Sequence, residues 1–353
     1  MYPEIHSHSN YGQQHHRPGG GYMNIWDAPR KVPMLKALRW ITTHSFRKKQ
    51  YALPPFQQTD PAFLKTPPDR LRITWIGHST TLIQLPGYNI LTDPIFSRRA
   101  SPLSFAGPDR KPPLPIGLED LPEVSIVLIS HDHYDHLDKD SITHIQERFD
   151  PLFLTPLGVA RTIRRWGAHN VLELDWWQFV DTDGIRFHCT PAKHFSGRRL
   201  TNRDDTLWVS WFLEVKSERL NIYYAGDSAY ASHFEEIRER LGAPDVALIP
   251  IGAYLPRWFM EAVHMEPAQA VAAFQALCAD YFIPIHWGTF DLADEPLNEP
   301  IELLEQYMAY HGLSSRLHPL AIGESFALEG KEVYEKASGG PGNVSPPPLT
   351  KDS

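Results

Sequence analysis

The segment Ser130-His131-Asp132-His133-Tyr134-Asp135-His136 places three histidines and two aspartates directly after the apolar run of residues 125–130. A run of this length is typical of a buried strand, and the end of a strand holds the following side chains rigidly. Imidazole and carboxylate groups together suit zinc, and also manganese or iron. The alternative is a polar loop that is rich in histidine by chance, which the interleaved carboxylates disfavour. We therefore expect metal ligands in this loop.

Further ligands are expected where later strands end. His194 follows the apolar stretch 187–190, Asp227 follows 222–225, and His286 ends the stretch 283–286. A lone histidine at the end of a strand is more often a hydrogen-bonded structural residue. Because one loop cannot complete a two-metal site, the 130–136 loop makes these three residues the expected remaining ligands.

The order of the predicted elements indicates an α+β fold. Hairpins dominate the first half of the chain, and strands mixed with helices follow in the second half. Strands are expected at residues 72–76, 81–85, 89–92, 125–130, 152–154, 171–174, 207–215, 221–225, 246–251, 281–286 and 325–328. Helices are expected at residues 158–166, 232–241, 301–310 and from Pro267 onward. Two mixed sheets packed face to face, with helices outside, accommodate this order best.

The His-x-His-x-Asp-His pattern of residues 131–136 resembles the hallmark of the metallo-β-lactamase superfamily, and the resemblance covers residues 71–328. It implies an αββα four-layer sandwich that binds two divalent metal ions, expected to be Zn²⁺, at one edge of the sheets. One metal would take His131, His133 and His194, the other Asp135, His136 and His286, and Asp227 would bridge them. Neither Cys189 nor Cys278 stands where many true β-lactamases place a cysteine, so antibiotic hydrolysis is not expected as the main activity.

Other motifs resemble the N-acyl-phosphatidylethanolamine-hydrolysing phospholipase D family. They are residues 73–80, 91–94, 249–254 and 256–260, His264 with Pro267, and residues 286–289. The resemblance implies a phosphodiesterase of lipid metabolism that releases N-acylethanolamine and phosphatidic acid through attack by a metal-bridging hydroxide. Three alternatives stay open: hydrolysis of another phosphodiester, hydrolysis of a lactone, and a non-catalytic metal-binding protein.

Auxiliary site residues follow from this reading. Asp135 and Asp227 would serve catalysis as well as metal binding, and His264 is the candidate that protonates the leaving oxygen. Asp93 and His78 are expected to orient the metal-binding imidazoles. Substrate contacts are expected from a rim that places one cation among apolar groups, at Tyr254, Arg257, Trp258, Phe259 and Met260.

Composition limits the remaining functions. The 353-residue chain has a formal net charge of −8, which disfavours a nucleic-acid binder. Its two cysteines cannot form a disulfide framework. No apolar run reaches the length of a membrane span and no secretory signal is visible, so the cytoplasm is the expected compartment.

The catalytic domain is expected to span residues 71–335, with separate segments before and after it. Residues 1–27, which carry His6, His8, His15 and His16, are interpreted as a disordered segment, with a metal-binding tract as the alternative. Residues 336–353 are expected to be a disordered tail. Residues 28–70 form a basic extension with a predicted helix from about Pro33.

Within that extension, residues 28–59 carry seven basic side chains and no acidic ones. This charge suits peripheral contact with an anionic membrane surface that holds the phospholipid substrate. The sequence leaves open whether the segment touches lipid or another subunit of a homodimer.

Overall fold

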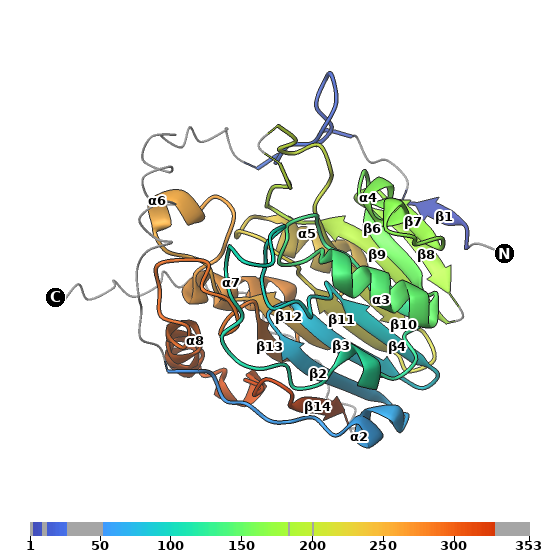
Figure 1. The fold of residues 1–353 in the computed structure, drawn as a ribbon. Coiled ribbons are helices and arrows are strands. Elements are labelled where there is room, and N and C mark those ends of the chain that lie inside the picture. The colour runs from blue at the N-terminus through green and yellow to red at the C-terminus, as the bar shows by residue number, and fades with distance from the viewer. Residues whose placement is uncertain (1–2, 9–12, 27–51, 183, 200, 329–353) are drawn as a thin grey trace.

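The computed structural model describes residues 3–8, 13–26, 52–182, 184–199 and 201–328. Two seven-stranded mixed sheets pack face to face, and helices cover their outer faces (Figure 1). This arrangement is the four-layer αββα sandwich that the sequence predicts.

The first sheet has the strand order β1-β8-β9-β10-β11-β12-β13. Strands β8 to β11 are antiparallel neighbours, whereas β11, β12 and β13 run parallel. The strands span Ile5–Ser7, Gln178–Thr182, Ile185–Pro191, Val209–Val215, Leu220–Tyr224, Val246–Pro250 and Tyr281–Ile285.

The second sheet has the order β14-β2-β3-β4-β5-β6-β7. Its first four strands are antiparallel and its last four are parallel, with β4 belonging to both groups. The strands span Ser325–Leu328, Leu71–Gly77, Thr80–Leu85, Tyr88–Thr92, Ile126–Leu128, Leu152–Pro156 and Val171–Leu174. The predicted hairpin of residues 81–92 is confirmed.

Side chains of the second sheet alternate between two apolar layers. On β3, Ile83 joins the main core between the sheets, whereas Leu82 faces the outer helices. On β5, Leu128 and Val127 divide in the same way. The period of two along a strand produces this division, so both faces of the sheet are buried.

The helices follow their caps and apolar faces. Helix α3 (Lys139–Phe149) is capped by Asp138, whose carboxylate accepts the Ser141 amide, and buries Ile142 and Ile145 against the second sheet. Helix α7 (Pro267–Leu277) starts with a proline and a capping box. The remaining helices are α2 (Pro61–Lys65), α4 (Ala160–Arg165), α5 (His233–Leu241), α6 (Arg257–Met260) and α8 (Glu299–Tyr310).

The strand directions explain where the site forms. Within the second sheet, β2, β4 and β5 run the same way, and within the first sheet β9, β11 and β13 do. The residues that follow these strands therefore emerge at one edge of each sheet. His78, Asp93, His131, His194, Asp227 and His286 all occupy such positions.

The described part of residues 1–27 is folded, so the expectation of disorder is wrong there. Strand β1 extends the first sheet by pairing Ile5 with Val180 of β8. Residues 13–24 form a hairpin closed by the bridge between His16 and Tyr22. The composition of residues 1–27 favoured disorder. The edge of β8 and polar contacts to distant loops, however, supply this segment with partners that composition does not reveal.

The expected domain limits are placed only in part. The predicted helix from Pro33 and the tail of residues 336–353 lie outside the described residues. Residues 52–70 contain α2 and a bridge between Phe56 and Ile322, which attaches them to the sandwich. None of the helices in the described ranges has both the length and the apolar character that crossing a bilayer requires.

Candidate metal centre

Three imidazoles meet at the first half of the site. Nε2 of His131 lies 2.8 Å from Nδ1 of His133, and Nε2 of His194 lies 3.2 Å from the same atom. His131 and His133 come from the loop after β5, and His194 comes from the loop after β9. Three nitrogens that converge without an intervening carboxylate form a typical metal-binding set.

The second half of the site combines a carboxylate with histidines. Oδ2 of Asp135 lies 3.4 Å from Nε2 of His136 and 3.6 Å from Nε2 of His286. Nε2 of His78 lies 2.9 Å from the same oxygen, and its ring packs 4.1 Å from that of His286. The sequence-predicted ligands of the second metal are therefore brought together, with His78 against them.

Asp227 lies between the two halves. Its Oδ2 is 3.1 Å from Nε2 of both His136 and His286. The same oxygen is 3.8 Å from Nε2 of His194 and 4.0 Å from Nε2 of His131. One carboxylate oxygen that faces imidazoles of both sets occupies the position a bridging ligand needs.

Asp93 fixes the orientation of two of these imidazoles. Its Oδ2 accepts hydrogen bonds from Nδ1 of His136 at 2.7 Å and from the Ser130 hydroxyl at 2.5 Å. Because the Ser130 hydroxyl donates to Asp93, it accepts from Nδ1 of His131, 2.9 Å away. Both histidines therefore direct Nε2 into the site.

Tyr224 completes this network, because its hydroxyl donates to Oδ2 of Asp93 at 2.6 Å. The expected orienting role of Asp93 has a direct structural basis in these contacts. Sequence reasoning missed Ser130 and Tyr224. The alternation on β11, which points Tyr224 toward the other sheet, is the signal that could have found Tyr224.

The segment of residues 263–264 supports the first half of the site. Nδ1 of His194 donates to the carbonyl oxygen of Val263 at 2.8 Å, so its Nε2 faces the other ligands. The ring of His264 lies 5.0 Å from that of His194 and 5.3 Å from that of His286. Nδ1 of His264 is 3.9 Å from Oδ2 of Asp227. The structure thus places His264 beside the ligands.

The backbone around the site adopts left-handed conformations and packs closely. His78, Asp93 and His286 each follow a strand and have φ values of 54°, 33° and 60°. Left-handed conformations at non-glycine residues are costly and cluster at functional sites. Gly226, with φ +57°, is packed so closely that a Cβ there would lie 2.5 Å from Cβ of Ser130.

Unsatisfied polar atoms show that the residues fit metal ions. Nε2 of His136, both ring nitrogens of His286 and Oδ1 of Asp227 are buried without a hydrogen bond to any described residue. Such atoms are rare in folded proteins unless a ligand satisfies them. A set of imidazoles and carboxylates is the donor set of zinc and of other first-row divalent metals.

The protonation states of His131, His194 and Asp227 agree with this fit. Burial holds the pKa of His131 and of His194 well below the usual range, so these imidazoles are neutral as ligands must be. For Asp227, burial opposes ionisation, but His136 and His286 hold the pKa well below its usual range. For His286, burial acts against the charge, but Asp227 and Asp135 raise the pKa to about 9, so this imidazole would have to release a proton to bind a metal.

The loop of residues 130–136, called the ligand loop below, is held in place by contacts on its outer side. Arg198 donates to the carbonyl oxygens of Asp132 and Leu137 at 2.8 and 2.7 Å. Its guanidinium also lies over the Tyr134 ring, 3.9 Å from the centroid. Oδ1 of Asp132 accepts the Gly197 amide at 2.7 Å. Asp132 thus ties the ligand loop to the segment after His194.

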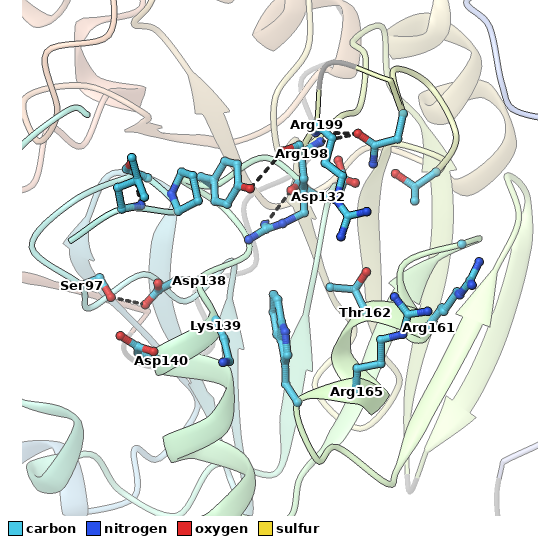
Figure 2. A pocket seen from close by; sticks show the side chains of 18 of the residues that line it. Ser97, Asp132, Asp138, Lys139, Asp140, Arg161, Thr162, Arg165, Arg198 and Arg199 are labelled. Carbon is cyan, nitrogen blue, oxygen red and sulfur yellow. Dashed lines mark hydrogen bonds between the residues drawn. The ribbon is translucent and has the colours of Figure 1, made fainter. Parts of the chain in front are cut away.

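A wide pocket of about 1490 Å³ opens beside these contacts. Figure 2 shows Arg198 and Arg199 on one side of it and Arg161 and Arg165 on another. Asp132 and Tyr134 of the ligand loop line the pocket, but the seven expected ligands are not among its lining residues. The pocket therefore adjoins the outer side of the loop, away from the converging ligand atoms.

The expected rim lies on β12's exit loop and α6. Tyr254 is buried, and its hydroxyl donates to Oε1 of Glu299 at 2.5 Å. Arg257 donates to Oε1 of Gln269 at 2.9 Å and to the carbonyl oxygen of His264 at 3.3 Å. Trp258 and Phe259 are partly exposed, whereas Met260 is buried. Substrate binding by these residues stays a prediction.

The chain belongs to the metallo-β-lactamase superfamily: a family model described as beta-lactamase superfamily domain matches residues 88–287. Within it, the relatives include N-acyl-phosphatidylethanolamine-hydrolyzing phospholipase D 1 of Caenorhabditis elegans, 39% identical over 67% of this chain and 69% of the relative. An uncharacterized protein of Mycobacterium tuberculosis is 39% identical over 81% of this chain and 77% of its own length. By family and fold, the chain is a metal-dependent hydrolase.

Solved structures agree on the fold. An isothiocyanate hydrolase from Delia radicum gut bacteria superposes with a TM-score of 0.59 at 21% identity, covering 73% of this chain and 99% of that one. Igni18, a metallo hydrolase from Ignicoccus hospitalis, gives a TM-score of 0.57 at 23% identity over 73% and 99% of the two chains. At these identities the likeness concerns architecture alone.

Proposed function

We propose that the chain is a phosphodiesterase of phospholipase D type that hydrolyses N-acyl-phosphatidylethanolamine to N-acylethanolamine and phosphatidic acid. The observation that carries the proposal is the 39% identity to the C. elegans relative that is named for this activity. A mitochondrial N-acyl-phosphatidylethanolamine-hydrolyzing phospholipase D from Saccharomyces cerevisiae is 33% identical over 71% of this chain and 55% of its own length.

Two zinc ions are proposed as cofactors. His131, His133 and His194 would hold one, Asp135, His136 and His286 the other, and Asp227 would contact both. Bound there, the ions would supply Lewis-acid stabilisation of phosphoryl charge and activation of water. Most of the proposed ligands are imidazoles. An anionic diester that enters the site would therefore meet only two carboxylates, Asp135 and Asp227, among them.

His264 is proposed to assist departure of the ethanolamine oxygen. Burial lowers its pKa to about 4, despite the nearby Asp227, so the imidazole is neutral around pH 7. Its buried Nδ1 has no hydrogen-bond partner among the described residues. A neutral ring can donate an N–H hydrogen bond to the leaving oxygen, which limits the charge that builds there.

Arg257 stays a proposed substrate contact, and it would also act through His264. It holds the carbonyl oxygen of His264 and Oε1 of Gln269, and it lies 3.5 Å from Oε2 of Glu266. These contacts keep the loop after α6 in place. The partly exposed rings of Trp258 and Phe259, whose centroids are 5.5 Å apart, are proposed to meet the acyl chains.

Phospholipid is therefore the proposed partner, and peripheral contact with anionic membranes through residues 28–59 remains part of the proposal. The charge of that segment supports it. Most of the segment lies outside the described residues, and its sequence supplies the support for this contact.

The test is product analysis with N-acyl-phosphatidylethanolamine, combined with elemental analysis of the purified chain. We expect N-acylethanolamine and phosphatidic acid, loss of both after chelation, and recovery with zinc. His286→Asn should abolish turnover, whereas His318→Asn, a histidine outside the site, should retain it. Chelator-sensitive hydrolysis of a phosphodiester chromogen or a lactone, without N-acylethanolamine, would overturn the substrate assignment and keep the hydrolase.

A further inference from the structure

A second histidine–carboxylate cluster lies away from the ligands of the candidate centre. Nε2 of His15 is 2.6 Å from Oδ1 of Asp175, and Nε2 of His16 is 2.8 Å from Oδ2 of the same carboxylate. The two histidines lie on the hairpin of residues 13–24, and Asp175 follows β7. Segments about 160 positions apart thus converge on one point.

Packing and hydrogen bonds hold the side chains of this cluster in place. His15 is 3% exposed and stacks on Trp176, with ring centroids 4.1 Å apart. The Trp176 amide donates to Oδ1 of Asp175, and the Asp175 amide donates to Oε1 of Gln178 at 2.8 Å. The ring of His16 meets that of His15 edge-on at 4.5 Å. Each donor atom is therefore held by packing or hydrogen bonds.

We propose that His15, His16 and Asp175 form a third metal-binding site, which takes a zinc-class divalent cation. Two imidazole nitrogens and a carboxylate oxygen, all within 4.8 Å of one another, form the donor set of a three-ligand zinc site with a remaining place for water. Ligand atoms of a tetrahedral zinc site lie roughly 3.3 Å apart, so the imidazoles would move outward by about half an ångström.

A cation can reach the cluster past His16, and the His16 side chain has room to move. The His16 side chain is 29% exposed, whereas those of His15 and Asp175 are 4% and 10% exposed. A cation can therefore reach the carboxylate past His16 while His15 keeps its place on Trp176. The same donor chemistry recurs in the candidate centre, where imidazole nitrogens lie 2.8 to 3.2 Å apart.

The hairpin links this site to the candidate centre. Nδ2 of Asn24 donates to the carbonyl oxygen of His194 at 2.8 Å. Arg17 pairs with Asp204 at 2.6 Å, and the Tyr22 amide donates to the Asp204 carbonyl oxygen. In Figure 1 the blue hairpin lies beside the yellow-green loop that follows β9. A cation bound by the hairpin would therefore stabilise the loop that carries His194, in a structural role.

The experiment measures zinc retained by the full chain. Wild-type protein is stripped with chelator, reloaded with zinc, passed through gel filtration in zinc-free buffer and analysed for zinc per chain. His16→Gln is the main variant, because His16 is partly exposed and its loss leaves the core intact. Asp175→Asn is the second variant, and His6→Gln, an exposed histidine on β1, is the matched control.

We expect His16→Gln and Asp175→Asn to hold one zinc fewer per chain than wild type, and His6→Gln to hold the same amount. Zinc should also raise the melting temperature of wild type more than that of His16→Gln. Because the result is a difference, it does not depend on the metal content or activity of the candidate centre. Equal zinc in wild type and His16→Gln, or a difference seen only at millimolar zinc, would overturn the proposal. His15, His16 and Asp175 would then form a hydrogen-bonded structural contact without metal.

Discussion

The carboxylate of Asp93 accepts a hydrogen bond from Nδ1 of His136 at 2.7 Å, and both side chains are fully buried. Through the Ser130 hydroxyl the same carboxylate also orients His131, a residue of the other ligand set. A single residue that contributes no atom to the ligand sets proposed for the two zinc ions thus aligns an imidazole in each half of the site.

Asp93→Asn should weaken metal binding. The amide keeps one acceptor oxygen and adds a donor, so it cannot serve Ser130, His136 and Tyr224 together. We expect metal affinity to fall by roughly 10–100-fold, measured by competition with a chromogenic chelator. Tyr224→Phe removes only one donor to Asp93 and should cause a smaller loss. Wild-type affinity in Asp93→Asn would contradict the alignment role.

Gly226→Ala should disturb the backbone that presents Asp227. The new Cβ would meet Cβ of Ser130 at 2.5 Å, and neither backbone can give way cheaply. We expect the free energy of unfolding to fall by about 1–3 kcal/mol, together with reduced metal content. Gly312→Ala is the matched control, because Gly312 has φ +69° with nothing within 4 Å. Equal effects of the two substitutions would attribute the cost to backbone conformation alone.

His264→Ala should lower kcat with the phosphodiester substrate by about 10² or more while zinc content stays unchanged. The reason is the loss of the buried Nδ1 that faces Asp227 at 3.9 Å. His264→Gln retains an N–H donor and should recover part of the rate. His6→Ala, remote on β1, serves as control. Full turnover in a metal-loaded His264→Ala enzyme would remove this residue from the mechanism.

His233 should make the fold sensitive to acid. It is fully buried beside Phe234, and burial lowers its pKa to about 3. Its pKa in the unfolded chain is about 6.5, so between pH 6.5 and pH 3 only the unfolded state takes up the proton. Stability due to this group is present above pH 6.5 and is lost as the pH falls through that window.

At pH 5 this loss should reach about 2 kcal/mol relative to pH 7, as the unfolded-state protonation implies. His233→Phe cannot be protonated and should lose correspondingly less stability between pH 7 and pH 5. Urea denaturation of both proteins at the two pH values gives the comparison. The same pH dependence in both proteins would show that the pKa of His233 is not lowered in the folded state relative to the unfolded state.

Sequence patterns predicted most of the sandwich, but they missed α3. Its surface carries several charges, so only Ile142, Ile145 and Phe149 mark an apolar face. The aspartate at position 138, directly before the helix, was available as a cap signal. The fold of the N-terminal segment could not be found in this way, because β1 has only three residues and depends on the edge of β8.

The sequence by itself determined most of the strands, the chemical types of the ligands and the family, since these depend on patterns of neighbouring residues. Only the tertiary structure decided that Asp227 stands between the two ligand sets, which ring nitrogen each histidine presents, and that His15 and His16 meet Asp175. These arrangements depend on the register of the sheets and on hydrogen bonds between segments far apart in the chain, and local sequence patterns carry no information about either.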